Sequence, residues 1–382
     1  MPLFKFPAFV ATALLCLCCT VASAQTATPV LDTTTNEDFS KIKKPPRTIA
    51  DVIRAIESSK VDPQEIEKAK ATVAAPVPQT DDKKELQAFY RKRADAYQRL
   101  GKIEEAIRDM RLATRDYRSS DMRTQIESLM ELGILENRGG NLKNAIDAYE
   151  QARAAIPRDL LGFHMGVNRL LIGAYSQAGD FAAADTALRD AEATMVVLRR
   201  SPVYFSSFGA SWESNLESAR AMTFLFQGRW VEAERAGWQS IRKINEALAQ
   251  FEQKQNNFTT YKAARQMDLA LAIMMQGRFV DAEIVCREAI DLTLKMFDRA
   301  SVDVAMGLTR LATIVAEQGR SSEAVALAQE AIKTYQAGGA SNDSLSMIRG
   351  RRVLGTALVS DRQYKQADEV FVTMKQGVDK HV

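Results

Sequence analysis

The stretch Gly133–Pro157 reads GILENRGGNLKNAIDAYEQARAAIP and predicts two antiparallel helices joined by a tight turn. Gly140 stands where the first helix has to end, because glycine adopts the left-handed conformation of a helix end without a side-chain penalty. Small residues stand on both sides of that turn, Gly133 before it and Ala145 after it. Two helices approach closely where such residues remove side-chain bulk, and Tyr149 is large enough to fill the remaining space.

The same pattern recurs along the rest of the chain. Seven turn residues are each followed five positions later by alanine, and the intervals between successive turns are 39, 39, 49, 49, 42 and 43 residues. The turn residues are Gly101, Gly140, Gly179, Gly228, Gly277, Gly319 and Arg362. No alternation of period two indicates a strand. Because each unit can bury its apolar face only against its neighbours, the sequence predicts an all-α solenoid over residues 83–378.

The two 49-residue intervals are longer than the others by about two helical turns. The extra residues lie around Ser201–Trp212 and around Arg242–Phe258. Trp230–Gln255 predicts one long helix, whereas Ser201–Gly209 is interpreted as a break with unusual aromatic content.

This pattern resembles the tetratricopeptide repeat (TPR). The residues that carry the resemblance in its fullest copy are Gly133, Gly140, Ala145, Tyr149, Ala152 and Pro157. Glu136 departs from the family, in which an aromatic residue is usual there. The 42- and 43-residue intervals and the stretch Ser301–Ala324 are similar to kinesin-light-chain-type repeats. The resemblance covers about residues 84–378 and implies a right-handed α-solenoid of about seven TPR-like helix pairs, whose first helices line a groove.

Residues 1–24 predict a cleaved signal peptide. Lys5 supplies a positive charge, Ala8–Val21 is a largely apolar run, and Ala22-Ser23-Ala24 has the small-x-small pattern of a cleavage site. An uncleaved membrane anchor is the alternative, although the apolar run is too short to span a bilayer. We therefore expect cleavage after Ala24, a periplasmic or secreted protein, and no stable membrane insertion after cleavage.

Residues 25–82 predict a linker that contains two short helices. Thr48 and Asp51 begin the first helix, and Asp62-Pro63 begins the second. The first helix has an apolar stripe formed by Ile49, Val52, Ile53 and Ile56. That stripe packs either onto the array itself or onto a partner. Residues 379–382 form a short tail.

The composition favours a binding protein over an enzyme. Lys and Arg total 51 and Asp and Glu total 48, a balance that argues against a nucleic-acid partner. His164 and His381 are the only histidines, so a histidine-based metal site or hydrolase is difficult to build. Three of the four cysteines lie in the leader, and Cys286 is interpreted as a buried structural thiol. No GxSxG, HExxH or phosphate-binding glycine motif occurs. We expect no enzymatic activity, no catalytic residue, no cofactor and no metal.

The resemblance to the TPR implies a groove for a protein or peptide ligand. The groove positions are charged in the first repeats and apolar in the middle ones, where methionine adapts to varied partners. The predicted groove residues are Arg91, Asp95, Arg138, Arg169, Met222, Phe226, Leu271 and Met275. The alternative for the apolar set is packing against the longer helices of the 49-residue units.

A second resemblance concerns the order of features along the chain. The signal peptide, Pro45–Asp51, Asp62-Pro63 and Phe89–Ala94 look like exported bacterial repeat proteins, some of which carry a C-terminal caspase-like CHAT domain. The leading hypothesis is an exported, non-catalytic scaffold or adaptor that binds protein or peptide in the bacterial cell envelope. Two alternatives stay open. One is a regulatory or truncated partner module of a CHAT-type protease system, and the other is a self-associating structural scaffold of the envelope.

Overall fold

The computed structural model describes residues 48–379, apart from 59–62, 101, 119–120, 251–254, 297–298, 300, 338–339 and 341. These residues form sixteen α-helices and one π-helical turn, and there is no strand among them. The predicted signal peptide, Gly101 and most of the predicted tail lie outside this part of the chain. None of the described helices has the length and apolar character that a membrane span requires.

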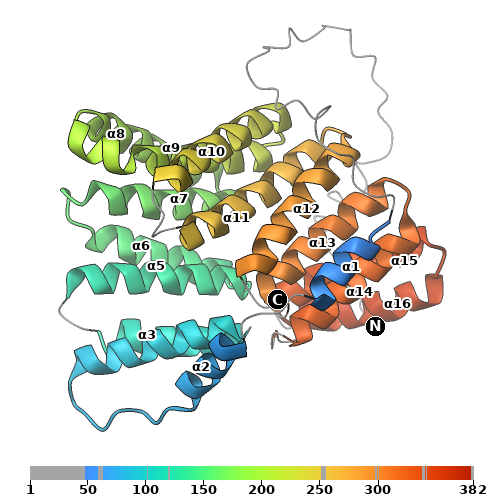
Figure 1. Ribbon diagram of the computed structural model, residues 1–382, viewed down its shortest axis with the longest axis horizontal. Helices are drawn as coiled ribbons and strands as arrows, with labels where there is room; N and C mark the ends of the chain where they lie inside the picture. The colour runs from blue at the N-terminus through green and yellow to red at the C-terminus, as the bar shows by residue number, and fades with distance from the viewer. Residues whose placement is uncertain are drawn as a thin grey trace, which may run out of the picture. The chain divides into compact units, whose positions relative to one another are not determined.

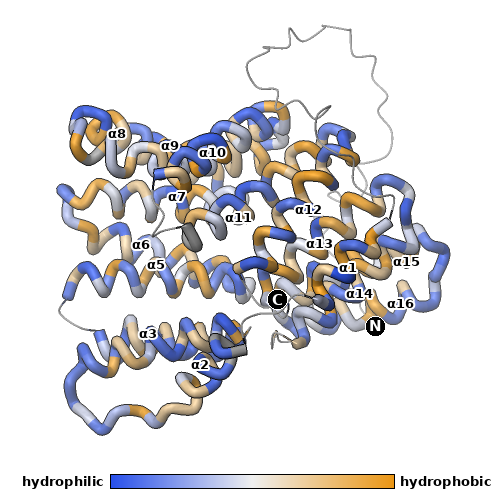
Figure 2. Tube along the Cα trace, in the orientation of Figure 1, coloured by the Kyte–Doolittle hydropathy of each residue, from blue (hydrophilic) through white to orange (hydrophobic). Residues whose placement is uncertain are grey.

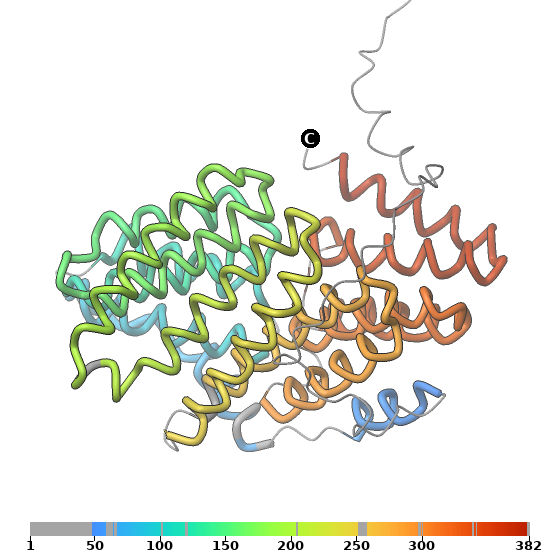
Figure 3. Tube along the Cα trace, turned by 90° about the horizontal axis from the view of Figure 1, so that it is seen from above, coloured from blue at the N-terminus to red at the C-terminus, as the bar shows by residue number. Residues whose placement is uncertain are grey.

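Helices α3 to α16 form seven successive pairs, and helices that follow one another in the sequence lie side by side (Figure 1, Figure 3). The predicted all-α, TPR-like solenoid is therefore confirmed. The first four pairs are α3 (Lys83–Arg99) with α4 (Ile103–Arg111), α5 (Met122–Arg138) with α6 (Leu142–Ala155), α7 (Leu161–Ala178) with α8 (Phe181–Arg199), and α9 (Pro202–Phe226) with α10 (Trp230–Gln250). The last three are α11 (Gln255–Met274) with α12 (Phe279–Met296), α13 (Val302–Glu317) with α14 (Ser321–Ala337), and α15 (Leu345–Ser360) with α16 (Tyr364–Val378). The π-helical turn Leu112–Asp116 directly follows α4.

Every turn residue of the repeat within the described ranges adopts the left-handed backbone conformation. The φ angle lies between 75° and 89° at the five glycines and is 62° at Arg362. At Gly140 the N–H of Asn141 donates to the carbonyl of Glu136 at 2.7 Å, and the N–H of Gly140 donates to the carbonyl of Asn137 at 3.1 Å. These two bonds satisfy carbonyls that the end of α5 would otherwise leave unpaired. The recurring turn, including its arginine copy, is confirmed.

Small residues mark the places where the two helices of a pair touch. A Cβ atom on Gly133 would lie 2.3 Å from Cε1 of Tyr149, and one on Gly355 would lie 2.5 Å from Cε1 of Phe371. Ala145 is completely buried between its helices. Hydrophobic and hydrophilic stretches alternate along the array (Figure 2), as expected for helices that bury one side.

The 49-residue units are accommodated by longer helices. Helix α9 has 25 residues and begins at Pro202, so the interpretation of Ser201–Gly209 as a break was wrong. Proline suits the first turn of a helix, and Phe205 packs against a hydrophobic cluster of the preceding pairs. The predicted long helix is α10, which ends at Gln250 within the described residues.

The first two pairs also contact the last two. Arg138 of α5 lies 3.4 Å from the carboxylate of Asp303, and its carbonyl accepts a hydrogen bond from Ser346 Oγ at 3.1 Å. One buried hydrophobic cluster combines residues from both ends of the array, among them Leu86, Tyr90, Ile107, Val302, Tyr335 and Met347. We call this the end-to-end contact. The repeat pattern did not predict it, because that pattern relates each pair only to its neighbours.

Candidate functional site

The helix α1 (Ala50–Ser58) packs onto α12 and α14, although 236 residues separate Asp51 from its partner Arg287 (Figure 1, Figure 3). Ile49, Val52 and Ile56 are buried in the same hydrophobic cluster as residues of α12 and α14. The apolar stripe predicted for this helix therefore packs onto the array itself.

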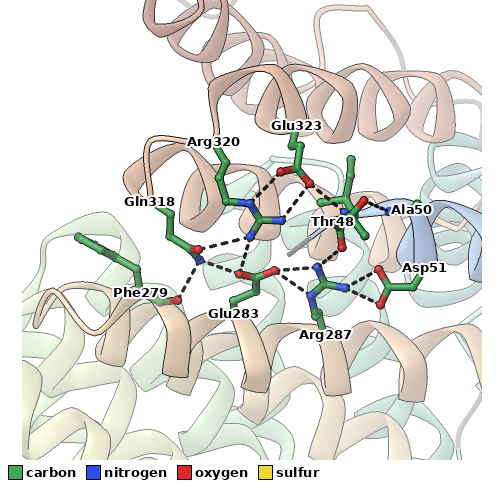
Figure 4. A network of polar contacts seen from close by, with 10 residues as sticks. Thr48, Ala50, Asp51, Phe279, Glu283, Arg287, Gln318, Arg320 and Glu323 are labelled. Atoms are coloured by element: carbon green, nitrogen blue, oxygen red, sulfur yellow. Dashed lines mark hydrogen bonds and ion pairs between the residues drawn. The ribbon is translucent and has the colours of Figure 1, made fainter. Parts of the chain in front are cut away.

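A buried arginine forms hydrogen bonds with residues at the beginning of α1 (Figure 4). Arg287 of α12 donates from Nη1 to both carboxylate oxygens of Asp51, at 2.8 and 2.7 Å, and from Nη2 to the carbonyl of Thr48 at 3.0 Å. Its Nε and Nη2 also donate to Glu283 of the same helix, at 2.9 and 2.7 Å. Arg287 is only 8% exposed, so these bonds satisfy a guanidinium group that is largely removed from water.

Helix α14 contributes the second half of this surface. The N–H of Ile49 donates to Oε2 of Glu323 at 2.9 Å. Arg320 donates to both oxygens of Glu323 at 2.9 Å and to Glu283 at 2.8 Å, which ties α14 to α12 (Figure 4). The hydrogen bond from Arg320 holds the pKa of Glu323 below its usual range and keeps this acceptor ionised. We call the surface formed by Glu283, Arg287, Arg320 and Glu323 the α1-docking surface.

Two of the predicted charged groove residues have partners within the array. Arg91 lies 3.3 Å from a carboxylate oxygen of Glu131 and 3.7 Å from one of Glu127. Asp95 pairs with Arg99 one turn later, at 2.9 Å. Much of the charge predicted for the start of the groove is thus balanced locally.

Arg138 and Arg169 lie near the same buried tyrosine. Burial raises the pKa of Tyr149, and the charges of Arg169 and Arg138 oppose that rise. Arg138 also belongs to the end-to-end contact through Asp303. The structure therefore places Arg138 and Arg169 in one region of the first helices.

The predicted apolar groove residues divide into two kinds. Phe226 and Met275 are each 42% exposed and stand two residues before the turn glycine of successive pairs. Met222 and Leu271 are half-buried, and Leu271 packs against the hydrophobic cluster that includes α12 and α14. For Leu271, packing within the array accounts for the apolar side chain, whereas the side chains of Phe226 and Met275 are exposed.

A pocket of about 560 Å³ lies beside the end-to-end contact. Arg111 and Arg138 line it, but Arg111 donates from Nε to Glu136 at 2.6 Å and Arg138 is paired with Asp303. Glu136, which departs from the TPR pattern, is buried and also accepts a bond from the side chain of Asn141 at 2.8 Å. These pairings offset the charge of two of the four arginines that line the pocket, and Arg108 and Arg115 are the other two.

The described residues show no arrangement typical of catalysis. Cys286 is buried, as predicted, and burial raises the pKa of its thiol to about 12, so it stays protonated near neutral pH. His164 makes a 3.1 Å contact with the carbonyl of Pro157. Within the described ranges no group of three or more His, Cys, Asp or Glu could hold a metal ion.

A second cluster of charges was missed by sequence reasoning, except for Arg169. Its members come from the first helices α7, α11, α13 and α15 and stand nine to thirteen residues before a turn residue, a span of about one helical turn. We call it the arginine cluster, and its residues are Arg169, Arg265, Asp268, Arg310 and Arg349. That shared position before the turn is the signal that could have found them.

No protein-family model matches the sequence, and no curated protein matches it. Among solved structures, a Rap protein complexed with Competence and Sporulation Factor is 12% identical, with a TM-score of 0.51 over 87% of this chain and 96% of that one. BtubC (BKLC) from P. vanneervenii is 14% identical over 64% of this chain and 91% of that one, with a TM-score of 0.46. A signal-transduction ATPase with a tetratricopeptide-repeat sensor from Pyrococcus horikoshii is 10% identical over 86% of this chain and 49% of that one, with a TM-score of 0.49. Identities this low concern the fold alone, and the chain is a TPR-like helical repeat protein.

Proposed function

We propose that the protein is an exported, non-catalytic scaffold that binds a protein or peptide in the bacterial cell envelope. The observation that carries the proposal is α1, because the array already holds one amphipathic helix. Three aliphatic side chains of this segment are buried, and Arg287 and Glu323 bond to polar groups at its beginning. A helical peptide that offers the same anchors at its first turn fits the same contacts.

The covering helix can be displaced. A helix of nine residues is too short to be stable in isolation, so α1 depends on its docking contacts. Segments with few contacts of their own open at lower free energy than the core of a protein. A competing peptide therefore gains access to the α1-docking surface without unfolding the array. The Rap structure, which contains Competence and Sporulation Factor, supports a binding role for an array of this fold.

The proposal is tested with a fluorescein-labelled peptide of residues 45–58, PPRTIADVIRAIES, added to the mature chain. We expect weak, saturable binding by fluorescence anisotropy, and tighter binding when Asp51→Arg in the chain weakens docking of its own helix. Arg287→Met should abolish binding, yet leave Glu283 paired with Arg320. The matched control is Arg242→Met on the exposed side of α10, which should bind like the unaltered chain. Absence of binding to the Asp51→Arg chain, or full binding to Arg287→Met, refutes the proposal.

Export is tested separately. The change of both Ala22 and Ala24 to Arg should block removal of the leader in a bacterial host, because signal peptidase requires small residues at these positions. The measurement is the mass of the protein recovered from periplasm and cytoplasm. Unchanged processing contradicts the predicted signal peptide and the proposed envelope location.

Self-association is a second candidate function, because the natural occupant of the α1-docking surface is a segment of this chain. Exchange of α1 between two copies would link them into a dimer. Sedimentation equilibrium of the mature chain distinguishes the two functions. A dimer that disappears in Arg287→Met favours the self-associating scaffold, and a monomer at all concentrations favours a separate ligand.

A further inference from the structure

The pocket beside the end-to-end contact is lined by both ends of the array. Part of its lining comes from α4, the π-helical turn and the end of α5, which belong to the first two pairs. The rest comes from the start of α13 and from residues around the start of α15, which belong to the last two pairs. We call this cavity the end pocket. Its volume of about 560 Å³ lies in the usual range of small-molecule sites, and π-helical turns are frequent at functional sites.

One part of the lining is apolar. Ile103, Ile107 and Val302 are at most 5% exposed and belong to the hydrophobic cluster of the end-to-end contact. Gly139 also lines the pocket, and a Cβ atom there would lie 2.7 Å from Cδ1 of Ile107. The absence of that side chain lets Ile107 pack closely against the end of α5. The end pocket therefore offers an apolar surface to the body of a ligand.

Arginines form the polar part of the lining. Arg108, Arg111 and Arg115 stand three and four residues apart, so they lie on one side of α4 and the π-helical turn. Arg108 is exposed and forms no ion pair among the described residues. Arg115 pairs with its neighbour Asp116 at 3.2 Å, an exposed contact that is worth little. The acidic lining residues are Glu104 and Asp343. Arginines thus outnumber carboxylates by four to two in the lining, which favours an anionic ligand.

A buried carboxylate holds one of these arginines in place. Glu136, at the position where the TPR usually has an aromatic residue, is 1% exposed. It accepts hydrogen bonds from Nε and Nη2 of Arg111 at 2.6 and 2.9 Å, and from the side chain of Asn141 at 2.8 Å. Arg111 and Asn141 both line the end pocket, and the side chain of Arg111 is 45% exposed. The bonds to Glu136 use Nε and Nη2, so Nη1 can donate to a ligand from a guanidinium group that is already oriented.

We propose that the end pocket binds a small molecule that carries a phosphate group on an apolar body. Several guanidinium groups can donate at once to the three oxygens of a phosphate, whereas a carboxylate has only two. The apolar body covers the surface formed by Ile103, Ile107 and Val302. The inference goes beyond the proposed function, because the end pocket shares no residue with the α1-docking surface.

A molecule bound in the end pocket holds the two ends of the array together. Because both ends contribute to the lining, the ligand binds the closed array and not an array whose ends have separated. A ligand that binds only one of two states shifts the equilibrium towards that state. The end pocket is therefore a site at which a small molecule controls the closure of the array.

The probe is 1-naphthyl phosphate, titrated into the mature chain by isothermal titration calorimetry. Of the comparison compounds, 1-naphthol lacks the phosphate, inorganic phosphate lacks the apolar body, and 1-naphthoate has a carboxylate instead. We expect one-to-one binding of the probe, at least about ten-fold tighter than that of 1-naphthol or inorganic phosphate and about three-fold tighter than that of 1-naphthoate. Absence of binding, or equal binding of any comparison compound, overturns the proposal.

Three variants test the position of the site. Arg108→Gln should weaken binding of the probe by about ten-fold and leave the melting temperature unchanged, because Arg108 is exposed. The matched control is Arg235→Gln, at an exposed residue of α10 that also stands seven positions after its turn residue, and it should change binding by less than about two-fold. Ala340→Glu places a negative charge in the lining from the other end of the array and should weaken binding by about ten-fold or more. Unchanged binding to Arg108→Gln or Ala340→Glu, or an equal loss in Arg235→Gln, overturns the assignment.

Amide hydrogen exchange tests the closure of the array. With the probe at about one hundred times its Kd, amides that exchange only when the ends separate should slow by up to about a hundred-fold, both in 103–115 and in 342–348. Exchange in α8, which does not line the end pocket, should not change. Slower exchange at one end alone would refute the closure. Arg287→Met should bind the probe like the unaltered chain, so this inference and the proposed function fail independently.

Discussion

Gly133→Ala should destabilise the protein far more than a one-carbon change usually does. A Cβ atom at this position would lie 2.3, 2.5 and 2.9 Å from Cε1, Cδ1 and Cζ of Tyr149. Carbon atoms pack at about 3.5–4.0 Å, so the ring would have to move by more than about 1 Å. Tyr149 is 1% exposed and enclosed by other helices, and overpacking of such a site costs roughly 1–3 kcal/mol. Alanine recovers about 1 kcal/mol through its higher helix propensity. Because the enclosed ring has no free space to move into, we take the upper end of the overpacking cost, about 3 kcal/mol, and expect a net loss of about 2 kcal/mol.

Two variants identify the clash as the cause of this loss. Gly319→Ala is the matched control, because no atom lies within 4 Å of its Cβ position and only the φ of 76° opposes a side chain. That strain costs about 1 kcal/mol. In a Tyr149→Leu background the ring is gone, and Gly133→Ala should become neutral or stabilising. The assay is urea unfolding followed by far-ultraviolet circular dichroism. An equal loss at Gly133 in both backgrounds, or a loss no larger than that at Gly319, would refute the reasoning.

Three further predictions concern the core, the thiol and α1. Ala282→Arg should cost about 3 kcal/mol or more because Ala282 is completely buried, whereas Lys102→Ala at an exposed site should change the free energy of unfolding by about 0.5 kcal/mol or less; equal effects in thermal melts would contradict the helix pairing. Cys286 should resist iodoacetamide at pH 8, well below the thiol pKa of about 12, and react after unfolding in guanidinium; rapid reaction of the native protein would contradict its burial. Asp51→Asn removes a charged partner of Arg287 and should loosen α1 by about 1–3 kcal/mol, seen as faster amide hydrogen exchange over 53–58; unchanged exchange would show that the ion pair does not hold the helix.

The candidate binding residues were predicted less completely than the fold. Arg91 and Asp95 stand at groove positions of the TPR pattern, yet Glu131 and Arg99 pair with them in the array. Which arginines lack partners depends on neighbours from other helices. Arg265 could therefore not be distinguished from the many surface arginines in the sequence.

The sequence by itself determined the helix pair and its repetition. A left-handed turn residue and the small residues beside it act over a few positions, so their spacing is sufficient to predict the end of one helix and the close approach of the next. Each pair also contacts its sequence neighbours in a regular way, so the repeat alone is sufficient to predict the stacking.

Only the tertiary structure decided which distant segments meet. Asp51 accepts a hydrogen bond from Arg287, which is 236 residues later in the sequence. The carbonyl of Arg138 accepts one from Ser346, which is 208 residues later. Such contacts depend on small rotations between successive pairs that add up along the array. The total rotation cannot be predicted from the sequence of any single repeat. The same accumulation brings the charges of α7, α11, α13 and α15 together and leaves Nη1 of Arg265 without a hydrogen-bond partner among the described residues.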